Sequence, residues 1–512
     1  MVKQAGGALL LSIHIEHGSP RPVSTQLHVA LRDLILSGGF APGQRLPASR
    51  TLARELAVSR TTVIEAFDRL TAEGLIESRV GAGTYVARAL EAPRPMMPAS
   101  TAQGPAARPP RLSRATERSL ELFGQRRRLP AIARAFTTAL PAFDAFPMAQ
   151  WGRLSAKHWR RARNEIMGYG EPFGHPPLRR AIAAHLRANR GISCDAEQIF
   201  IVSGAQQAFS LTATLLLNPG DRVWFENPGA IGARNSLIAA GAELVPVPVD
   251  AQGLCVEDGL AHSPDFLLAF VTPSHQQPLG VVMSLERRFA LLHAAAQAGA
   301  WIIEDDYDGE FTFGGTPLPT LKSIDTTGRV IYVGTFSKSL FPSLRLGYLL
   351  VPPSLVDTVK ALMSQLLQGV PTVVQAVVAE FIDEGHFSAH LRRMRRIYAE
   401  RHDTLCAAAG QRLAGLLEVV PSHSGLHTTA RFLAGQSEAA VMEAARLREL
   451  TVSPIARFWL TPPPGGGHSG LVLGFGAIRP PDIERGVEVL GQVLEALGPP
   501  PVGARPTSRQ WP

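Results

Sequence analysis

The chain has 512 residues, of which 45% are hydrophobic and 18% are charged, a composition typical of folded globular proteins that excludes wholesale disorder. A single hydrophobic core stops growing at roughly 250 to 300 residues, so at least two domains are expected. The formal net charge of +8 favours anionic partners such as nucleic acid or phosphorylated ligands, although an arginine-rich composition alone gives the same sign.

Residues 10–88 have the pattern of three helices followed by a β-hairpin. Apolar residues recur at helical spacing after Ser24, and again in two further segments for which Ser49 and Ser59 are the expected N-caps. Two short strands are expected on either side of a glycine-containing tip at residues 81–83, because glycine tolerates a positive φ. This order of elements predicts a winged helix-turn-helix.

The first turn of the third helix carries the side chains that a DNA-reading helix needs. Such a helix enters the major groove with its N-terminal end, where short or cationic side chains meet base edges and phosphates. Ser59 is expected to cap this turn, and Arg60 can form a bidentate pair with guanine. Thr61 and Thr62 can contact phosphate or a thymine methyl group, and Arg50 can hold the DNA backbone. A capped surface helix would have the same local sequence, but the hairpin behind it favours the DNA-binding interpretation.

Residues 89–129 are rich in proline, alanine and arginine, and they are too polar to build a core. We expect a linker. Its arginines either add non-specific attraction to phosphates or keep the tether solvated.

Residues 130–498 alternate apolar strand-like runs with helical stretches, which predicts an α/β domain with a mostly parallel sheet. The clearest expected strands cover residues 199–202, 223–225, 267–271, 301–303 and 330–333. Each run leads directly into polar or glycine residues. Because open α/β sheets bind ligands at the carboxyl ends of their strands, these polar clusters predict one shared pocket.

Lys338, in the stretch GTFSKSLFPSLRLGY, is the candidate for a lysine that links covalently to an aldehyde cofactor. Such a cofactor needs an acid that keeps its pyridine nitrogen protonated, and Asp305 at a strand end can provide it. Tyr307 can donate its hydroxyl to the phenolate oxygen of the cofactor. The acidic stretch EDDYDGE in isolation could equally hold magnesium, but the placement of all these groups at strand ends favours the cofactor, and no metal site is predicted.

A phosphate site is expected where the first of these strands meets the following helix. Backbone amides at a helix N-terminus bind anions, and the turn consists of Ser203, Gly204 and Ala205. Three residues near the lysine, Thr335, Ser337 and Arg345, can complete the cradle.

The cysteines and the apolar runs indicate the compartment. Cys194, Cys255 and Cys406 lack the spacing of a disulfide framework or a zinc site, which favours a reducing cytoplasm. The apolar patch at residues 8–15 is a poor signal peptide, and no run approaches the roughly 18 residues that span a bilayer. No membrane partner is therefore expected.

Two long stretches carry a family resemblance. The run GFAPGQRLPASRTLARELAVSRTTVIEAFDRLTAEGLIESRVGAGTYV resembles the winged helix-turn-helix of the GntR family. The segments YGEPFGHPPLRRAIAAHL, VSGAQQA, VTPSHQQPLG and IEDDYDGEF, together with the lysine stretch, resemble the fold-type I aminotransferase domain. Taken together, the chain resembles the MocR-type regulators of the GntR family.

The resemblance implies a set of partners and site residues. The DNA contacts carry over to Arg50, Arg60, Thr61, Thr62, Gly81 and Ala82. The resemblance implies that the cofactor is pyridoxal 5'-phosphate, attached to Lys338. Asp305 and Tyr307 would then contact its ring and Arg345 its phosphate. Tyr169 resembles the tyrosine that reaches the cofactor of the neighbouring subunit, which implies a homodimer with sites at its interface.

Three positions depart from the aminotransferase pattern. Ala230 stands where a tyrosine usually packs on the pyridine ring, and Gln277 stands where an aromatic residue is more usual. The stretch Ser469–Phe475 lacks the arginine that commonly holds a substrate carboxylate, for which the remaining candidates are Arg431 and Arg457. His427 is expected to be a structural histidine.

These expectations favour a cytoplasmic regulator that binds double-stranded operator DNA and senses pyridoxal phosphate, a small amino compound, or both. One alternative is an active aminotransferase with an accessory DNA-binding module. Another is a regulator whose large domain has lost the cofactor and only dimerises, which the intact set of Lys338, Asp305, Tyr307 and Arg345 argues against.

Overall fold

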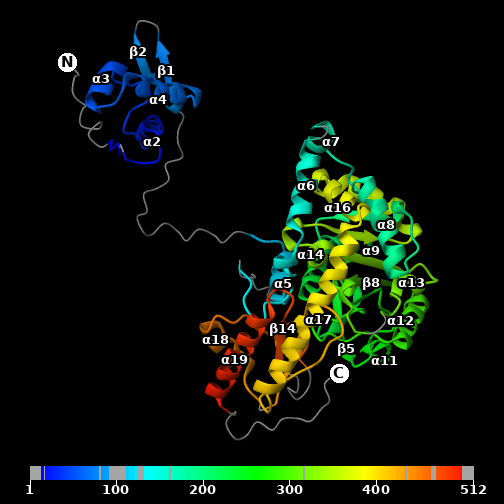
Figure 1. Ribbon diagram of the computed structural model, residues 1–512. Coiled ribbons are helices and arrows are strands. Elements are labelled where there is room, and N and C mark those ends of the chain that lie inside the picture. Colours follow the sequence, from blue (N-terminus) through cyan, green and yellow to red (C-terminus); the bar gives the residue numbers. More distant parts are fainter. Residues whose placement is uncertain are drawn as a thin grey trace. The chain divides into compact units, whose positions relative to one another are not determined.

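The computed structural model describes residues 13–16, 18–79, 82–91, 111–124, 132–160, 163–314, 317–433, 435–462 and 469–498. The chain divides into two compact units, Met1–Pro110 and Arg111–Pro512 (Figure 1).

The N-terminal unit is a helix-turn-helix followed by a β-hairpin. Its elements are α2 (Val23–Leu36), α3 (Ser49–Glu55), α4 (Arg60–Ala72), β1 (Ile76–Arg79), β2 (Gly83–Val86) and the short helix η1 (Arg88–Glu91). Leu27, Leu52 and Val63 have no exposed surface, because the apolar stripes of the three helices meet in one core. The strands are antiparallel, with Ile76 opposite Val86. The arrangement is the expected winged helix-turn-helix.

Two predicted helix starts are corrected by the structure. Helix α2 begins one residue before Ser24. Helix α3 begins at Ser49 itself, after Ala48, and no side chain caps it, so Ser49 is not an N-cap. Ser59 is confirmed as the cap of α4, because its Oγ accepts a hydrogen bond from the Thr62 amide at 3.0 Å.

The large unit is built on an eight-stranded sheet. In spatial order its strands are β3 (Ile199–Val202), β10 (Gly347–Leu350), β9 (Val330–Thr335), β8 (Trp301–Asp306), β7 (Leu268–Val271), β4 (Arg222–Asn227), β5 (Glu243–Asp250) and β6 (Gly253–Leu254). The pairs from β9 to β5 are parallel, whereas β10 is antiparallel to both of its neighbours and β6 is antiparallel to β5. The five strands predicted from the sequence are present, and the sheet is mostly parallel.

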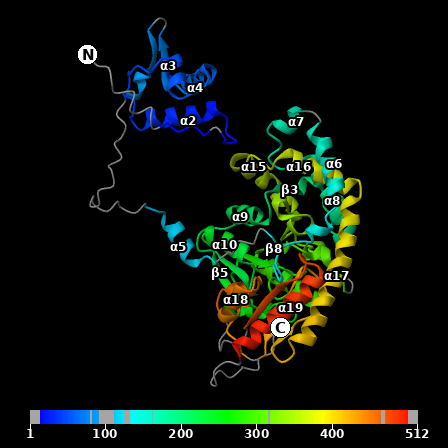
Figure 2. The ribbon, with the colours of Figure 1, turned by 60° about the vertical axis from the view of Figure 1, so that its left-hand side comes forward.

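Helices cover both faces of this sheet (Figures 1 and 2). Successive residues of a strand face opposite sides, so Ile303 packs in one core cluster and Ile302 in another. The cluster with Ile303 includes α9 (Ala205–Leu216), α10 (Ile231–Ala239) and α15 (Val356–Leu366). The cluster with Ile302 includes α11 (Val256–His262), α12 (Leu285–Ala298) and α13 (Leu321–Ile324).

A second layer of elements completes the large unit. Helices α6 (Met148–Trp159), α8 (Pro176–Arg190), α16 (Thr372–Asp383) and α17 (His386–Arg412) pack on one another, and α7 (Arg163–Met167) contacts α16. A smaller antiparallel sheet has the order β11 (Leu417–Val419), β12 (His427–Phe432), β14 (Gly470–Gly474) and β13 (Ser453–Pro454), accompanied by α18 (Glu438–Leu447) and α19 (Pro480–Leu497). Among the described helices, none has the length and apolar character to cross a membrane.

The segment expected to be a linker contains a helix, α5 (Arg114–Leu122). Ser113 caps it by accepting a hydrogen bond from the Thr116 amide at 3.1 Å. The helix is anchored to α10, because the Gly124 amide donates to Asn235 Oδ1 at 2.9 Å and Arg234 donates to the Leu122 carbonyl at 3.2 Å. Residues 111–124 of the expected linker therefore belong to the large unit. Arg126, Arg127 and Arg128 lie outside the described residues.

Candidate DNA-binding surface and cofactor pocket

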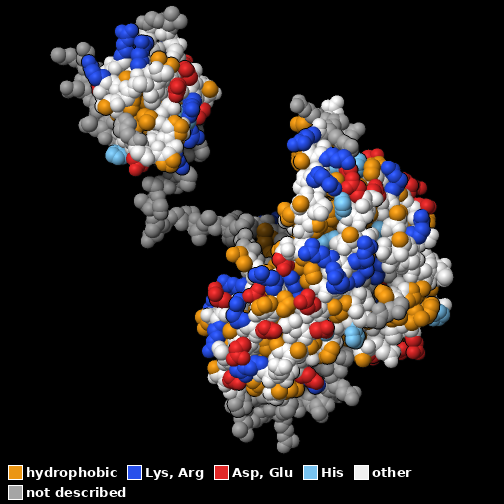
Figure 3. All heavy atoms as spheres, viewed as in Figure 1, with side chains coloured by type: hydrophobic (Ala, Val, Ile, Leu, Met, Phe, Trp, Pro, Cys, Tyr) orange, Lys and Arg blue, Asp and Glu red, His pale blue; other side chains and the backbone are white. Residues whose placement is uncertain are grey.

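The first turn of α4 presents the predicted DNA-contacting residues to solvent. Arg50, Arg60 and Thr61 are exposed. Thr62 is half-buried, and its hydroxyl shares a hydrogen bond with Ser59 Oγ at 2.8 Å. The cap thus orients Thr62, while Arg60 and Thr61 remain available to a groove. Figure 3 shows lysine and arginine side chains gathered in patches on this unit.

The wing adds two cations that the sequence analysis missed. A Cβ on Gly83, whose φ is +112°, would lie 2.8 Å from Arg45 Nε, so the glycine lets Arg45 pack against the hairpin. Arg79 lies over the ring of Tyr85 at 4.8 Å. Ala82 is described and its amide donates to the Arg79 carbonyl at 3.0 Å, whereas Gly81 lies outside the described residues. The sequence did not indicate that Arg45 and Arg79 both lie at the hairpin, because they are 34 positions apart.

The antiparallel strand β10 explains why distant residues meet at the sheet edge. It lies between β3 and β9, with Gly347 opposite both Val202 and Thr335. Its start therefore lies beside the carboxyl ends of its neighbours. Arg345, two residues before that start, is brought next to the turn after β3 and the lysine segment after β9.

Lys338 lies in α14 (Phe336–Ser339), directly after β9. Its side chain is half-buried, and its Nζ donates to the Ala139 carbonyl at 2.7 Å. Thr335 caps this short helix by accepting from the Ser337 amide at 3.1 Å. The cap holds the lysine at the carboxyl edge of the sheet.

Asp305 is a buried acid with an unsatisfied oxygen. It lies on β8, is 5% exposed, and its Oδ1 has no hydrogen-bond partner. Burial, with the nearby Asp306 and Asp308, raises the pKa of Asp305 well above its usual value, and Lys338 opposes the shift. An orphaned buried acceptor of this kind is matched by the N–H of a protonated pyridine ring.

The turn after β3 has the geometry of an anion cradle. Gly204, with φ +104°, precedes α9, and a Cβ on it would lie 4.0 Å from Arg345 Nη1. Arg345 itself is left-handed, with φ +51°. The Ser203 amide and hydroxyl both donate to Gln207 Oε1, at 2.6 and 2.9 Å. The Arg345 guanidinium thus lies close to the N-terminus of α9, and both a guanidinium and a helix N-terminus attract phosphate.

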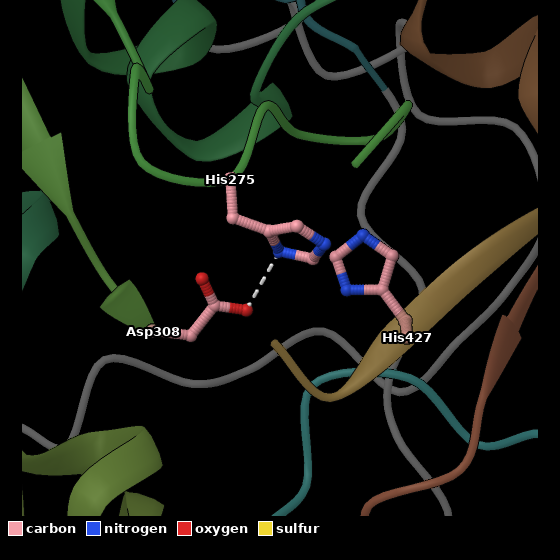
Figure 4. Close-up of side chains that lie close together, drawn as sticks. All are labelled: His275, Asp308 and His427. Carbon is pink, nitrogen blue, oxygen red and sulfur yellow. Dashed lines mark hydrogen bonds and ion pairs between the residues drawn. The ribbon is translucent and has the colours of Figure 1, made fainter. Parts of the chain in front are cut away.

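Tyr307 belongs to a hydrogen-bonded network that was not predicted. Its hydroxyl lies 3.0 Å from His275 Nδ1, and the same nitrogen lies 3.0 Å from Asp308 Oδ2. Burial above all raises the pKa of Tyr307 well above its usual value. Figure 4 shows His275 between Asp308 and His427, whose ligand atoms all lie within 4.8 Å of one another, a spacing that can hold a metal ion. The stretch VTPSHQQPLG was the available signal for His275.

Lys338, Tyr307 and Asp308 meet at one pocket, whose volume is about 370 Å³ when the space open to solvent is included. Its lining includes Lys338, Tyr307, Asp308, His427, Gln277, Phe458 and Val472. His427, expected to be a structural histidine, is one of these lining residues. Ala230 is 4% exposed at the start of α10, and the adjacent Gly229 amide donates to the Phe458 carbonyl at 3.1 Å. Phe458 is an aromatic residue that lines the pocket.

The remaining candidates lie elsewhere. Arg431 pairs with Glu418, and Arg457 donates to Ser453 Oγ at 3.2 Å, so neither is among the described residues that line the pocket. Tyr169 is 92% exposed, on the loop before α8.

Comparison with known proteins matches both units. Residues 24–86 match the family of bacterial regulatory proteins named gntR, and residues 144–459 match the aminotransferase class I and II family. The chain is 41% identical over 476 residues to the probable rhizopine catabolism regulatory protein MocR of Rhizobium meliloti, covering 93% of this chain and 94% of that protein. It is 31% identical over 467 residues to the pyridoxine biosynthesis transcriptional regulator PdxR of Corynebacterium glutamicum, covering 91% and 95%.

Among solved structures, the large unit is similar to LysN, the α-aminoadipate aminotransferase of Thermus thermophilus, complexed with N-(5'-phosphopyridoxyl)-L-leucine. The TM-score is 0.65 at 25% identity, over 75% of this chain and 95% of that one. The winged helix-turn-helix, the central sheet and these matches agree. The chain belongs to the MocR-type transcriptional regulators, in which a GntR-family DNA-binding unit is joined to a fold-type I aminotransferase-like domain.

Proposed function

We propose that this regulator binds pyridoxal 5'-phosphate covalently at Lys338 and uses it to make operator binding respond to a small amine. The observation that carries the proposal is the buried, unpartnered Oδ1 of Asp305, in the same site as Lys338. The cofactor, when bound, supplies an aldehyde carbon that combines with amines and a ring that withdraws electrons.

Each residue has a proposed role toward that group. Asp305 holds the proton of the ring nitrogen, and Tyr307 donates to the phenolate oxygen. Ser203, Gly204 and Ala205, with Thr335, Ser337 and Arg345, hold the phosphate. Tyr169 reaches the cofactor of a second subunit in a homodimer, which is consistent with its 92% exposure.

The DNA-binding part of the proposal rests on α4 and the wing. Arg60 reads a base, while Thr61, Thr62, Arg50 and the wing residues Gly81 and Ala82 position the unit on the duplex. We assign residues 10–88 to this domain, 130–498 to the sensor and 89–129 to their connection, of which α5 docks on the sensor. A protein with these roles acts in the cytoplasm, where bacterial DNA lies.

Sensing is favoured over efficient transamination by the departures around the pocket. Turnover needs a substrate clamped so that its reacting bond is aligned, and a misplacement of about 1 Å can cost about 100-fold. Gln277 and Val472 line the pocket where such a clamp is expected.

The absorbance spectrum of the purified protein tests cofactor binding. Addition of pyridoxal phosphate is expected to give a visible band, and borohydride reduction followed by peptide mapping is expected to place the adduct on Lys338. Absence of the band, or an adduct on another lysine, would contradict the proposal.

A further inference from the structure

One arginine of α10 joins the wall of the pocket beside Lys338 to helix α5, the first described element of the large unit. Arg234 donates from Nη1 to the Trp459 carbonyl at 2.9 Å and from Nη2 to the Leu122 carbonyl at 3.2 Å. We propose that Arg234 transmits the occupancy of the pocket to α5. This inference rests on the proposed function, since it names the route by which the sensor site acts on the rest of the chain.

The first carbonyl that Arg234 binds belongs to the pocket wall. Phe458 directly precedes the residue that carries it and lines the pocket together with Val472. Both pack in one apolar cluster with Ile231, in the first turn of α10. The Gly229 amide, just before that helix, donates to the Phe458 carbonyl at 3.1 Å. A ligand that moves or orders Phe458 therefore acts on the start of α10 and on the carbonyl held by Arg234.

The second carbonyl belongs to the end of α5. Leu122 is the last residue of this helix, so its carbonyl lacks a partner within the helix and attracts a cation. Two further hydrogen bonds join the Gly124 backbone to the Asn235 side chain, both at 2.9 Å. A Cβ on Gly124 would lie 3.1 Å from Ile231 Cγ2, so the glycine lets the chain lie close against α10. Helix α5 is thus fixed to the same helix whose first turn packs on the pocket wall.

Helix α5 is held weakly enough to respond to a small change. It has nine residues, fewer than the roughly 12 to 15 below which isolated helices are marginal in water. Ser119 is its one buried residue, while Leu120 is 59% exposed. Its docking therefore depends on a few hydrogen bonds, whose donor–acceptor distances are confined to about 2.7 to 3.2 Å. A displacement of the pocket wall by about 1 Å is enough to break the bond to Arg234.

The guanidinium of Arg234 is suited to join two segments. Its planar fork presents N–H donors in fixed directions, so one rigid group holds both carbonyls. Burial is the one influence that shifts the pKa of Arg234, downward, so no carboxylate among the described residues offsets its charge. Loss of one carbonyl leaves a half-buried cation with fewer acceptors, which costs free energy. The two contacts of Arg234 therefore depend on each other.

Docking of α5 determines the length of the connection between the large unit and the DNA-binding unit. When α5 is released from α10, the connection lengthens by the residues of the helix. The effective concentration of one tethered unit near another depends on the length of the tether. A change in α5 docking therefore changes how readily the two DNA-binding units of a dimer occupy two half-sites.

Hydrogen exchange of the peptide that contains α5 tests the proposal on the full-length protein. Exchange is measured without cofactor and after loading with pyridoxal phosphate and reduction with borohydride, so that occupancy of the pocket is fixed and is checked by absorbance. We expect loading to slow exchange in α5 about fivefold, because a ligand stabilises the arrangement of the pocket that it binds. In Arg234→Met, which keeps an aliphatic stem, exchange without cofactor should be faster, and loading should change it by less than about twofold.

Two further variants separate transmission from anchoring. Asn235→Ala removes the bonds to Gly124 and leaves Arg234 with both carbonyls, so exchange should be faster in both states and the response to loading should be retained. Arg222→Met is the matched control, since Arg222 is an exposed arginine of β4 that pairs with Asp265. It should behave as the unsubstituted protein does.

Three results overturn the proposal. One is α5 exchange that loading leaves unchanged in the unsubstituted protein, a comparison that needs no variant. Another is a full response to loading in Arg234→Met. The third is a response that Asn235→Ala loses as completely as Arg234→Met, since the contact would then anchor α5 without transmitting the state of the pocket.

Failure of this inference differs from failure of the proposed function. If no visible band forms with pyridoxal phosphate, the proposed function fails. If the reduced adduct forms on Lys338 and α5 exchange does not respond, only the route through Arg234 is wrong.

Discussion

Three acids at the carboxyl end of the central sheet, Glu226, Asp305 and Asp306, are buried but differ in their partners. Asp306 pairs with Arg190 and accepts from the Tyr332 hydroxyl. Glu226 accepts from the Thr272 amide and hydroxyl, at 3.0 and 2.6 Å. Asp305 and Asp306 each keep one oxygen, Oδ1, without a hydrogen-bond partner, but the other oxygen of Asp306 is paired with Arg190, whereas Asp305 lies next to the lysine that is to hold the cofactor.

Glu226 is buried and has no counter-ion among the groups that shift its pKa. The pH dependence of stability therefore tests this description. Burial raises the pKa of Glu226 from 4.5 to about 7. The folded state thus binds the proton more tightly, so the contribution to stability is complete below pH 4.5 and is lost as pH rises through about 7. Relative to Glu226→Gln, the unfolding free energy of the unsubstituted protein should fall over this interval by up to about 3 kcal/mol.

Urea unfolding followed by tryptophan fluorescence measures that difference, because residues 1–110 contain no tryptophan and the signal reports the large unit. Parallel pH profiles for the two proteins would show that the Glu226 carboxyl is not perturbed.

Arg60 is the residue expected to read sequence. Arg60→Ala should weaken binding to the operator by about 1 to 3 kcal/mol, because a bidentate base contact is lost while the cap and core remain. Titration of operator and random DNA at one salt concentration separates base from phosphate contacts. Arg32→Ala is the control, since Arg32 pairs with Glu73 on the far end of α4. Equal losses on both DNAs for Arg60→Ala would mean that Arg60 contacts phosphate only.

Lys338 is expected to matter for the cofactor and not for DNA binding without effector. Lys338→Ala should abolish the visible band while leaving operator affinity in the absence of amines largely unchanged, since the lysine belongs to the large unit. Absorbance and DNA titration of the same preparation check both. A retained band in the variant would place the covalent link on another residue.

The starts of helices α3 and α4 differ, because a side chain caps α4 and none caps α3. Ser59→Ala should destabilise the first turn of α4 by about 1 kcal/mol, because the bond from the Thr62 amide is lost. Ser49→Ala is the matched substitution at a helix start without a side-chain cap, and it should have little effect. Hydrogen exchange of peptides spanning each start, in the full-length protein, reports the two changes. Equal protection losses would show that Ser49 also caps its helix.

The bounds of a helix or strand could be predicted where the local sequence alone determines them. The strand β3 begins and ends at the predicted residues, because an apolar run is bounded by polar and glycine residues. The start of α3 was not predictable in this way, since Ala48 adopts an extended conformation without contributing a cap. Helix α5 was missed because its polar sequence is held by contacts to α10, which lie more than 100 positions away.

In the molecule as a whole, the sequence predicted individual residues of the site but not how the fold brings them together. Lys338, Asp305 and Arg345 follow from strand ends and the family resemblance. The parallel pairing of β8 and β9 brings Asp305 near Lys338, whereas the approach of Arg345 depends on the antiparallel insertion of β10. His275 lies in the stretch VTPSHQQPLG, but it meets His427 and Tyr307 only after folding, because the three residues come from different regions of the chain.

We propose that ligand binding in the large unit changes DNA binding by the small one. An effector need only bind differently to two states of the protein, and a coupling of about 1 to 3 kcal/mol alters operator affinity about 5- to 150-fold. Turnover is not required for such coupling.

The most direct measurement follows operator affinity and product formation together, in one cofactor-loaded sample titrated with a panel of amino acids, hydroxylated amines and 2-oxo acids. We expect at least one amine both to shift the visible band and to change operator affinity at least about fivefold, with slow or no multiple turnover. Rapid transamination with operator affinity unchanged by every ligand would contradict it and identify an aminotransferase that carries an accessory DNA-binding unit.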